Sequence, residues 1–195
     1  MNYLVHLYLS GDDPELQLGG MMGDFVKGPI PAGYSEKIRL GLMLHRRIDS
    51  FSQTSRHCRN SRRRLHPRFG HVRSVMVDVF YDHFLAMEWS GYHSRPLEIF
   101  AEDFYRVLVA CEALLPDRLA RIAPRMIEHN WLVAYREKAA VERALRGLAS
   151  RLSRPTPLAE GLEELHRHEE GLVNDFRGFM EEAQEFSGKL LDCER

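Results

Sequence analysis

The stretch "VMVDVFYDHFL", residues 75–85, decides the fold. Its apolar residues recur at helical spacing, which predicts a central and mostly buried helix. Asp78 and Asp82 lie four residues apart inside this run, and His83 follows directly. Aspartate is a poor residue for the middle of a helix, and two aspartates are costly to bury without partners. The stretch therefore indicates a helical core that also carries polar chemistry.

The rest of the chain shows helical patterns on both sides of this stretch. Residues 2–9 favour a short helix, and a second pattern begins at Pro14 and stops at Gly28-Pro29. Ser35 is the expected N-cap of an amphipathic helix that carries "LHRRIDSF". We see no repeat and no linker, so we predict one all-α domain over residues 1–195, an irregular helical bundle. Further helices are expected over residues 96–115, 118–129, 137–152 and 158–187.

Length and composition fit a globular protein. The chain has 195 residues, of which 44% are hydrophobic and 28% are charged. No apolar run approaches the roughly 20 residues that cross a bilayer, and the N-terminus lacks the features of a secretory signal. Cys58, Cys111 and Cys193 are far apart and show no CxxC spacing. We therefore expect no disulfide framework and a cytoplasmic location.

Charge is distributed unevenly although the formal net charge is only −1. Between Arg46 and Arg73 lie nine arginines and a single acid, Asp49, whereas residues 158–195 carry eleven acids and four bases. One interpretation is a basic segment paired with an acidic C-terminal helix. Another is a basic surface that steers an anionic partner, and the two are compatible.

Three segments place acids or histidines within apolar surroundings. His45 and Asp49 are four residues apart and share one helix face, as do Asp78 and Asp82, while Asp24 lies in "MMGDFVKG". A divalent cation would make the burial of several carboxylates tolerable, and imidazole with carboxylate suits Mn, Fe or Zn. Each residue could instead pair with an arginine, or lie in the core with its hydrogen bonds made by other groups. His6 is a weaker candidate for a supporting role beside such a site.

Two arginines, Arg46 and Arg47, follow His45 directly. The planar guanidinium can bind two phosphate oxygens at once, and a metal cation next to arginine is typical of sites that hydrolyse phosphoesters. The chain contains no GxSxG, P-loop or GxGxxG pattern. Trp131, Tyr135 and Arg136 in "NWLVAYRE" could pack in the core or line a substrate groove.

Several motifs taken together resemble the acyl carrier protein phosphodiesterase family. They are "MNYLVHLYLS" (1–10), "GDFVKG" (23–28), "HRRIDSF" (45–51), "DVFYDHFLAMEWS" (78–90) and "WLVAYRE" (131–137). The resemblance implies an all-helical, rearranged relative of the HD phosphohydrolases that depends on a divalent metal, typically Mn²⁺, with Mg²⁺ or Fe²⁺ as alternatives. It implies removal of 4′-phosphopantetheine from the serine of holo acyl carrier protein, an activity of lipid metabolism. The carrier protein would be the partner, and the protein would bind neither nucleic acid nor a membrane.

The same resemblance carries six candidate catalytic residues onto this chain: Asp24, His45, Asp49, Asp78, Asp82 and His83. Of these, Asp24, His45, Asp82 and His83 are expected nearest the metal. Arg46 and Arg47 are the candidates for binding the substrate phosphate. The acidic carrier protein would dock on a basic segment formed by Arg56, Arg59, Arg62, Arg63 and Arg64.

Two other interpretations stay open at this point. An HD-like phosphohydrolase could act on a nucleotide or another small phosphodiester. A non-enzymatic module could bind nucleic acid or a carrier protein through the arginines. Against nucleic acid, the arginine segment has little aromatic interleaving, with only Phe69, and the overall charge is near neutral.

Overall fold

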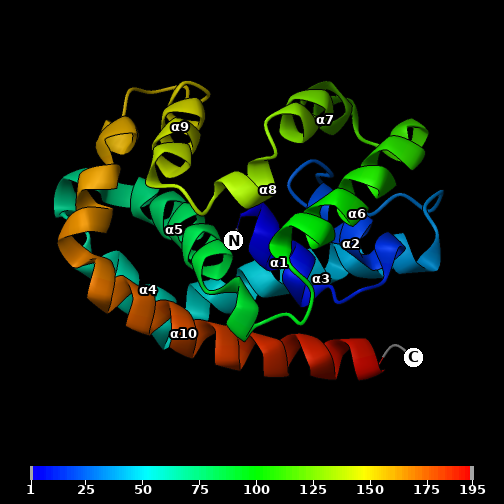
Figure 1. Cartoon of the computed structure of the whole chain (residues 1–195), viewed down its shortest axis with the longest axis horizontal. Helices are drawn as coiled ribbons and strands as arrows, with labels where there is room; N and C mark the ends of the chain where they lie inside the picture. The colour runs from blue at the N-terminus through cyan, green and yellow to red at the C-terminus, as the bar shows by residue number, and fades with distance from the viewer. Residues whose placement is uncertain (1, 194–195) are drawn as a thin grey trace.

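The computed structural model describes residues 2–193 and shows an irregular bundle of helices (Figure 1). Over these residues there are ten α-helices, four short 3-10 helices and no strand, which confirms the all-α prediction. The more specific expectation of an HD-like arrangement stays a prediction. The α-helices are α1 (Tyr3–Leu9), α2 (Pro14–Met22), α3 (Glu36–Thr54), α4 (Arg56–Arg64), α5 (Arg73–Met87), α6 (Leu97–Ala110), α7 (Asp117–Glu128), α8 (Trp131–Ala134), α9 (Lys138–Ala149) and α10 (Leu162–Cys193).

Helix α5 forms the centre of the bundle, as its sequence predicts. It contacts α1, α9 and α10, and ten of its fifteen residues are buried. The Tyr81 ring packs against Phe176 and Phe179 of α10, at centroid distances of 5.4 Å and 5.5 Å. One continuous hydrophobic cluster extends from Leu4 to Ala183, so the first and last helices belong to the same core.

Helices α2 and α3 pack with their backbones in direct contact, and glycines allow it. A Cβ added at Gly19 would lie 2.2 Å from the Ile38 carbonyl oxygen, and one added at Gly41 would lie 2.3 Å from that of Leu16. Backbone atoms cannot move aside, so only glycine fits at this crossing. The glycines that weaken α2 as an isolated helix therefore allow it to pack directly against α3.

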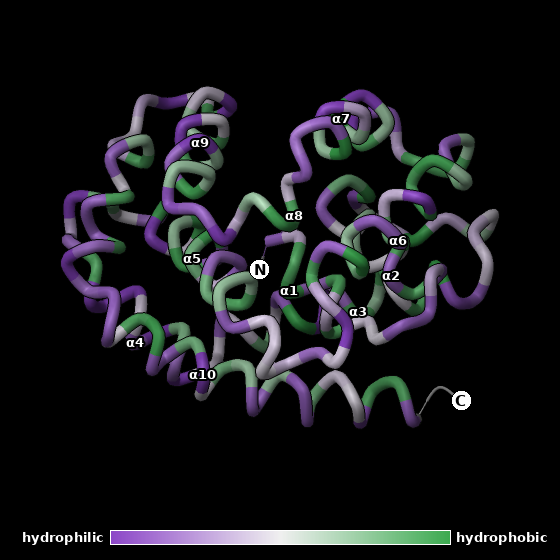
Figure 2. Tube along the Cα trace, viewed as in Figure 1, coloured by the Kyte–Doolittle hydropathy of each residue, from purple (hydrophilic) through white to green (hydrophobic). Residues whose placement is uncertain are grey.

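Helix α4 packs on α10, which joins the basic segment to the acidic helix. The Arg64 side chain pairs with Asp175 at 2.8 Å, and Arg56 lies 3.6 Å from Glu182. Hydrophilic and hydrophobic residues alternate along α10, as expected for a helix with one face on the core (Figure 2). The predicted pairing of the two charged segments is confirmed.

No helix within residues 2–193 is long and apolar enough to span a membrane. Cys58 is buried as a free thiol, Cys111 is a free, partly exposed thiol, and the side chain of Cys193 lies outside the described part of the structure. Burial raises the pKa of the Cys58 thiol to about 12, so this thiol is protonated at neutral pH.

Candidate metal site

Two buried histidines and a partly exposed aspartate, from α1 and α3, come together at one site. One ligand atom from each of His6, His45 and Asp49 lies within 4.8 Å of the others. The Asp49 carboxylate reaches both rings, with its Oδ1 3.2 Å from His6 Nε2 and its Oδ2 3.3 Å from His45 Nε2. The spacing of four residues on α3 places His45 and Asp49 on one face, as the sequence predicts.

The His45 ring is held in one orientation by α2. Its Nδ1 lies 2.7 Å from the Gly20 carbonyl oxygen, so Nδ1 donates a hydrogen and Nε2 faces the carboxylates. Gly23 makes room for the ring, because a Cβ there would lie 2.1 Å from His45 Cγ. Asp24 follows, with its Oδ1 3.7 Å from His45 Nε2. The glycine-rich end of α2 thus brings Asp24 to the imidazole.

The His6 ring stacks on the His45 ring, with centroids 3.6 Å apart and an angle of 14° between the planes. It is 1% exposed, and neither ring nitrogen has a well-formed hydrogen bond. Burial and the neighbouring His45 lower the pKa of His6 to about 3. His6 is therefore neutral, which is the form of histidine that binds metals, and its Nε2 faces the Asp49 carboxylate.

A positive charge is favoured between the carboxylates. Burial opposes it, but Asp24 and Asp49 raise the pKa of His45 to about 9. Burial likewise disfavours the charge on Asp49, yet His45 and His6 hold the pKa of this carboxyl well below its usual range. Asp78 on α5 lies near enough that, besides burial, the charges of Asp49 and Asp24 raise its pKa.

The other two predicted residues have different surroundings. Asp82 is fully buried, and its two oxygens accept hydrogens from the backbone amides of Leu4 and Val5 at 2.9 Å and 3.0 Å. It therefore caps the first turn of α1, for which Asn2 supplies no side-chain cap. His83 lies 2.6 Å from the Tyr135 carbonyl oxygen through its Nδ1. The structure thus brings Asp24, His45 and Asp49 together near Asp78, and places neither Asp82 nor His83 among them.

His6 is the residue whose importance sequence reasoning underrated. Its signal was a single histidine inside the apolar run "LVHLYL". The run shows that the ring is buried, but only the packing of α1 against α3 shows which groups it meets.

The two arginines after His45 diverge, as adjacent helix positions must. Arg46 donates through Nη2 to the Val26 carbonyl oxygen at 2.9 Å, which ties α3 to the segment after Asp24, and Arg47 is exposed. In the α4 segment, Arg59 and Arg62 donate to backbone carbonyls near the end of α3. Arg63 is exposed, so the basic segment partly supports the fold and partly faces solvent.

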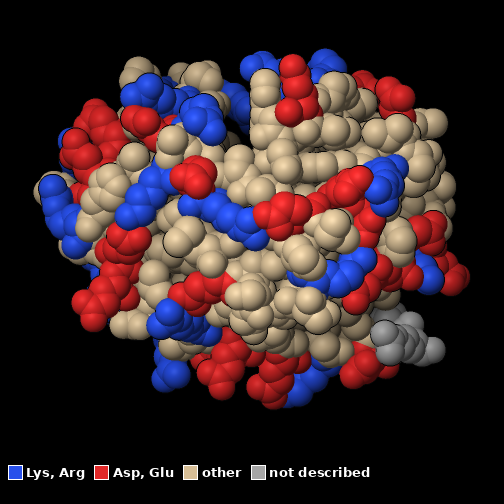
Figure 3. All heavy atoms as spheres, in the orientation of Figure 1, with Lys and Arg blue, Asp and Glu red and all other residues tan. Residues whose placement is uncertain are grey.

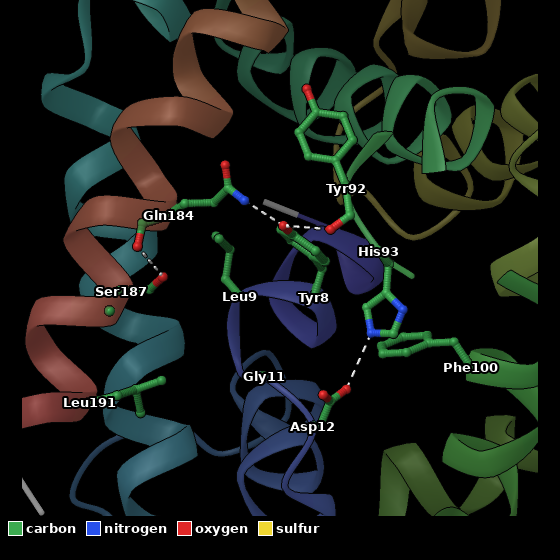
Figure 4. A pocket seen from close by; sticks show the side chains of 11 residues that line it. Tyr8, Leu9, Gly11, Asp12, Tyr92, His93, Phe100, Gln184, Ser187 and Leu191 are labelled. Atoms are coloured by element: carbon green, nitrogen blue, oxygen red, sulfur yellow. Dashed lines mark hydrogen bonds and ion pairs between the residues drawn. The ribbon is translucent and has the colours of Figure 1, made fainter. Parts of the chain in front are cut away.

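Two of the hollows on the surface of residues 2–193 are of interest for function. The larger, about 710 Å³, is a groove between α7 and α9 that begins at Asn2 and Tyr3 of the N-terminal segment. Figure 3 shows it as a notch in the upper edge, with basic side chains on both sides. The smaller, about 310 Å³, lies between α1 and α10 (Figure 4). There Tyr8 donates to the Tyr92 carbonyl oxygen, His93 lies 3.2 Å from Asp12, and none of the predicted site residues takes part.

The donor set of the cluster fits a divalent transition metal. Two imidazole nitrogens and the Asp49 carboxylate are ligands that Mn, Fe or Zn accept, and Asp24 places a second carboxylate beside His45. Two further observations fit a cation at this site: the His6 nitrogens lack well-formed hydrogen bonds, and a positive charge is favoured between the acids. The side chains of Asp24 and Asp49 are 46% and 41% exposed, whereas those of His6 and His45 are 2% and 4% exposed. The open side of the cluster is therefore its carboxylate side.

Fold and site together define an all-helical protein with two buried histidines beside partly exposed carboxylates, a cluster suited to a divalent cation. The chain belongs to the acyl carrier protein phosphodiesterase family, whose model matches residues 1–183. This confirms the resemblance seen in the motifs.

Similar proteins cover almost the whole chain. A protein of Klebsiella pneumoniae subsp. pneumoniae named acyl carrier protein phosphodiesterase is 31% identical over 180 residues, which are 92% of this chain and 93% of the relative. Proteins of the same name from Serratia proteamaculans and Yersinia enterocolitica are 29% and 28% identical, over 92% and 95% of this chain and 93% and 98% of theirs. No solved structure matches the chain significantly.

Proposed function

We propose that this protein is a metal-dependent phosphodiesterase that hydrolyses holo acyl carrier protein. Water adds to phosphorus, the bond between phosphorus and the serine oxygen breaks, and the serine oxygen takes up a proton. The products are apo carrier protein and 4′-phosphopantetheine. Membership in the family supports the activity, and the histidine–carboxylate cluster is the observation that supports metal dependence.

In this proposal His6, His45, Asp49 and Asp24 hold the cation. Asp82 and His83, both expected near the metal from the resemblance, take structural roles instead. Both Asp82 oxygens accept hydrogen bonds from backbone amides of α1, and His83 Nδ1 donates to the Tyr135 carbonyl oxygen. A bound Mn²⁺, Mg²⁺ or Fe²⁺ would acidify water and neutralise phosphoryl oxygens. Without a cation, the carboxylates on the open side would repel an anionic phosphodiester.

The protein's own residues orient and hold the components. The Gly20 carbonyl fixes the tautomer and direction of His45, so Nε2 is available on the side of the carboxylates. Asp49 bridges both rings and sets their spacing. Arg46 keeps further guanidinium donors beyond the one used on Val26, and with Arg47 it remains our candidate for binding the substrate phosphate.

Replacing His45 tests metal dependence directly. His45→Ala removes one ligand, so we expect loss of the bound metal and of holo carrier protein hydrolysis, with an unchanged helical circular dichroism spectrum. In the wild type, Mn²⁺ at a hundredfold excess over its dissociation constant should add about 2.7 kcal/mol of stability. For a chain of this size that is roughly 5–10 °C in melting temperature, measured against protein treated with EDTA.

The matched control is His71→Ala, which removes an exposed histidine outside the cluster. It should keep both the metal and the melting shift. A His45→Ala protein that still binds Mn²⁺ and hydrolyses holo carrier protein at the wild-type rate would refute the assignment. A nucleotide panel assayed beside the carrier protein separates this activity from that of a general HD-like phosphohydrolase.

A further inference from the structure

The groove between α7 and α9 begins close to the candidate metal site. Tyr3 lines its inner end and stacks on Phe25, the neighbour of Asp24, with ring centroids 6.4 Å apart. Three residues after Tyr3, on the same helix, comes His6. A ligand whose phosphate lies at the cluster could therefore extend past Tyr3 into the groove.

The lining of the groove combines an apolar wall with hydrogen-bond donors. Ile122, Trp131, Ala144 and Leu148 form part of the wall, and the alanines and Gly147 on α9 leave it open. Arg125, Arg143 and Arg151 contribute guanidinium groups, and none of the described residues that line the groove is Asp or Glu. Such a surface suits a neutral, partly apolar chain that presents carbonyl and hydroxyl oxygens and ends in phosphate.

We propose that this groove binds the pantetheine arm of the substrate, with the phosphate end at Tyr3 and the thiol end toward the outer part of α9. The proposal rests on the proposed function and adds where the arm lies. Pantetheine carries a gem-dimethyl group, methylenes, two amides and a hydroxyl, which match the apolar wall and the donors. The groove volume of about 710 Å³ lies in the roughly 300–1,000 Å³ range of small-molecule sites.

Trp131 provides a reporter that does not depend on turnover. It lines the groove and is partly exposed, whereas the other tryptophan, Trp89, is 2% exposed and donates its indole hydrogen to the Arg95 carbonyl oxygen. Free pantetheine, which has no phosphate, should change the fluorescence of the wild-type protein in EDTA. Trp131→Phe should abolish that change, and Trp89→Phe should keep it.

Filling the groove tests the position of the arm. Ala144→Phe places a ring in the groove, and we expect at least tenfold weaker pantetheine binding and a higher KM for holo carrier protein. The matched control is Ala139→Phe, at an exposed position of the same helix outside the groove, which should bind pantetheine as the wild type does. Thermal unfolding followed by circular dichroism verifies that both variants are folded.

Pantetheine that leaves Trp131 fluorescence unchanged, or that binds Ala144→Phe as tightly as Ala139→Phe, would overturn the inference. A wild-type protein that fails to hydrolyse holo carrier protein in the presence of Mn²⁺ would instead refute the proposed function. The two failures are separate because binding is measured without metal and without turnover.

Discussion

Asp82 shows how a buried carboxylate can look like a metal ligand in the sequence and act as a helix cap in the structure. Its two oxygens satisfy two of the amides that the first turn of α1 leaves without partners. Burial raises the pKa of Asp82 to about 7, while these two amides act in the opposite direction. Because α1 carries His6, the cap also fixes the start of the helix on which the candidate site depends.

The substitution Asp82→Asn separates these two roles. The amide keeps one acceptor oxygen and turns an NH₂ group toward a backbone N–H, so we expect a loss of about 1–3 kcal/mol in the free energy of unfolding. Urea denaturation measures this loss, and metal analysis of the folded variant should find the wild-type content. A variant of wild-type stability that lacks metal would make Asp82 a ligand and contradict its role as a cap.

At the scale of elements, the crossing of α2 and α3 sets the spacing between Asp24 and His45. Gly19 and Gly41 allow the backbones to touch, and Gly23 lets the His45 ring lie against the end of α2. The positions of Asp24 and His45 therefore depend on three glycines, at which a Cβ would force the neighbouring atoms apart.

Gly19→Ala tests the closeness of this crossing. Its Cβ would meet the Ile38 carbonyl oxygen, so the helices must separate, and we expect a loss of about 1–3 kcal/mol or more from overpacking. Gly188→Ala in α10 is the matched control, because its Cβ would meet nothing within 4 Å. It should stabilise the protein by up to about 1 kcal/mol, through helix propensity. Equal midpoints of urea unfolding for the two variants would contradict the close crossing.

At the scale of the whole molecule, the sequence was most informative where periodicity was strong. The buried run around Phe80 predicted α5, and Ser35 predicted the start of α3, where its hydroxyl accepts from the Ile38 amide at 3.2 Å. The pattern after Pro14 ran on to Gly28, whereas α2 ends at Met22, because the chain must turn there to bring Asp24 to His45.

Site membership was harder to predict than helices. The spacing of four residues predicted that His45 and Asp49 are neighbours, and the structure confirms this. The same spacing predicted that Asp78 and Asp82 share a helix face. That logic cannot tell which end of a buried helix faces the other acids. Asp78 lies toward Asp49 and Asp24, whereas Asp82, one turn further on, meets the amides of α1. Only tertiary packing distinguishes the two.

The distribution of charge over the whole surface bears on the partner. With a net charge of −1, long-range attraction of an acidic carrier protein has to come from local basic surface. Arg63 on α4 is exposed, and Figure 1 places α4 and the groove between α7 and α9 on different parts of the molecule. The carrier protein would thus meet a basic surface apart from the groove that takes its arm.

Arg63→Glu tests this docking surface. We expect a several-fold higher KM for holo carrier protein at low ionic strength and a smaller effect at 0.5 M salt, where screening is strong. Arg39→Glu makes the same charge change at an exposed position on α3, and it should leave KM near the wild-type value. Equal effects of the two substitutions would show that KM depends on the net charge of the protein and not on a docking surface at α4.

The contact of α10 with the first helix has a consequence for the order of folding. Gln184 donates to the Tyr8 hydroxyl across 176 positions of the chain, and Phe176 and Phe179 complete the core around Tyr81. Contacts of such long sequence separation form late and slow folding. During synthesis, the core around Tyr81 therefore stays open until α10 has left the ribosome, and in that interval the nascent chain exposes apolar surface.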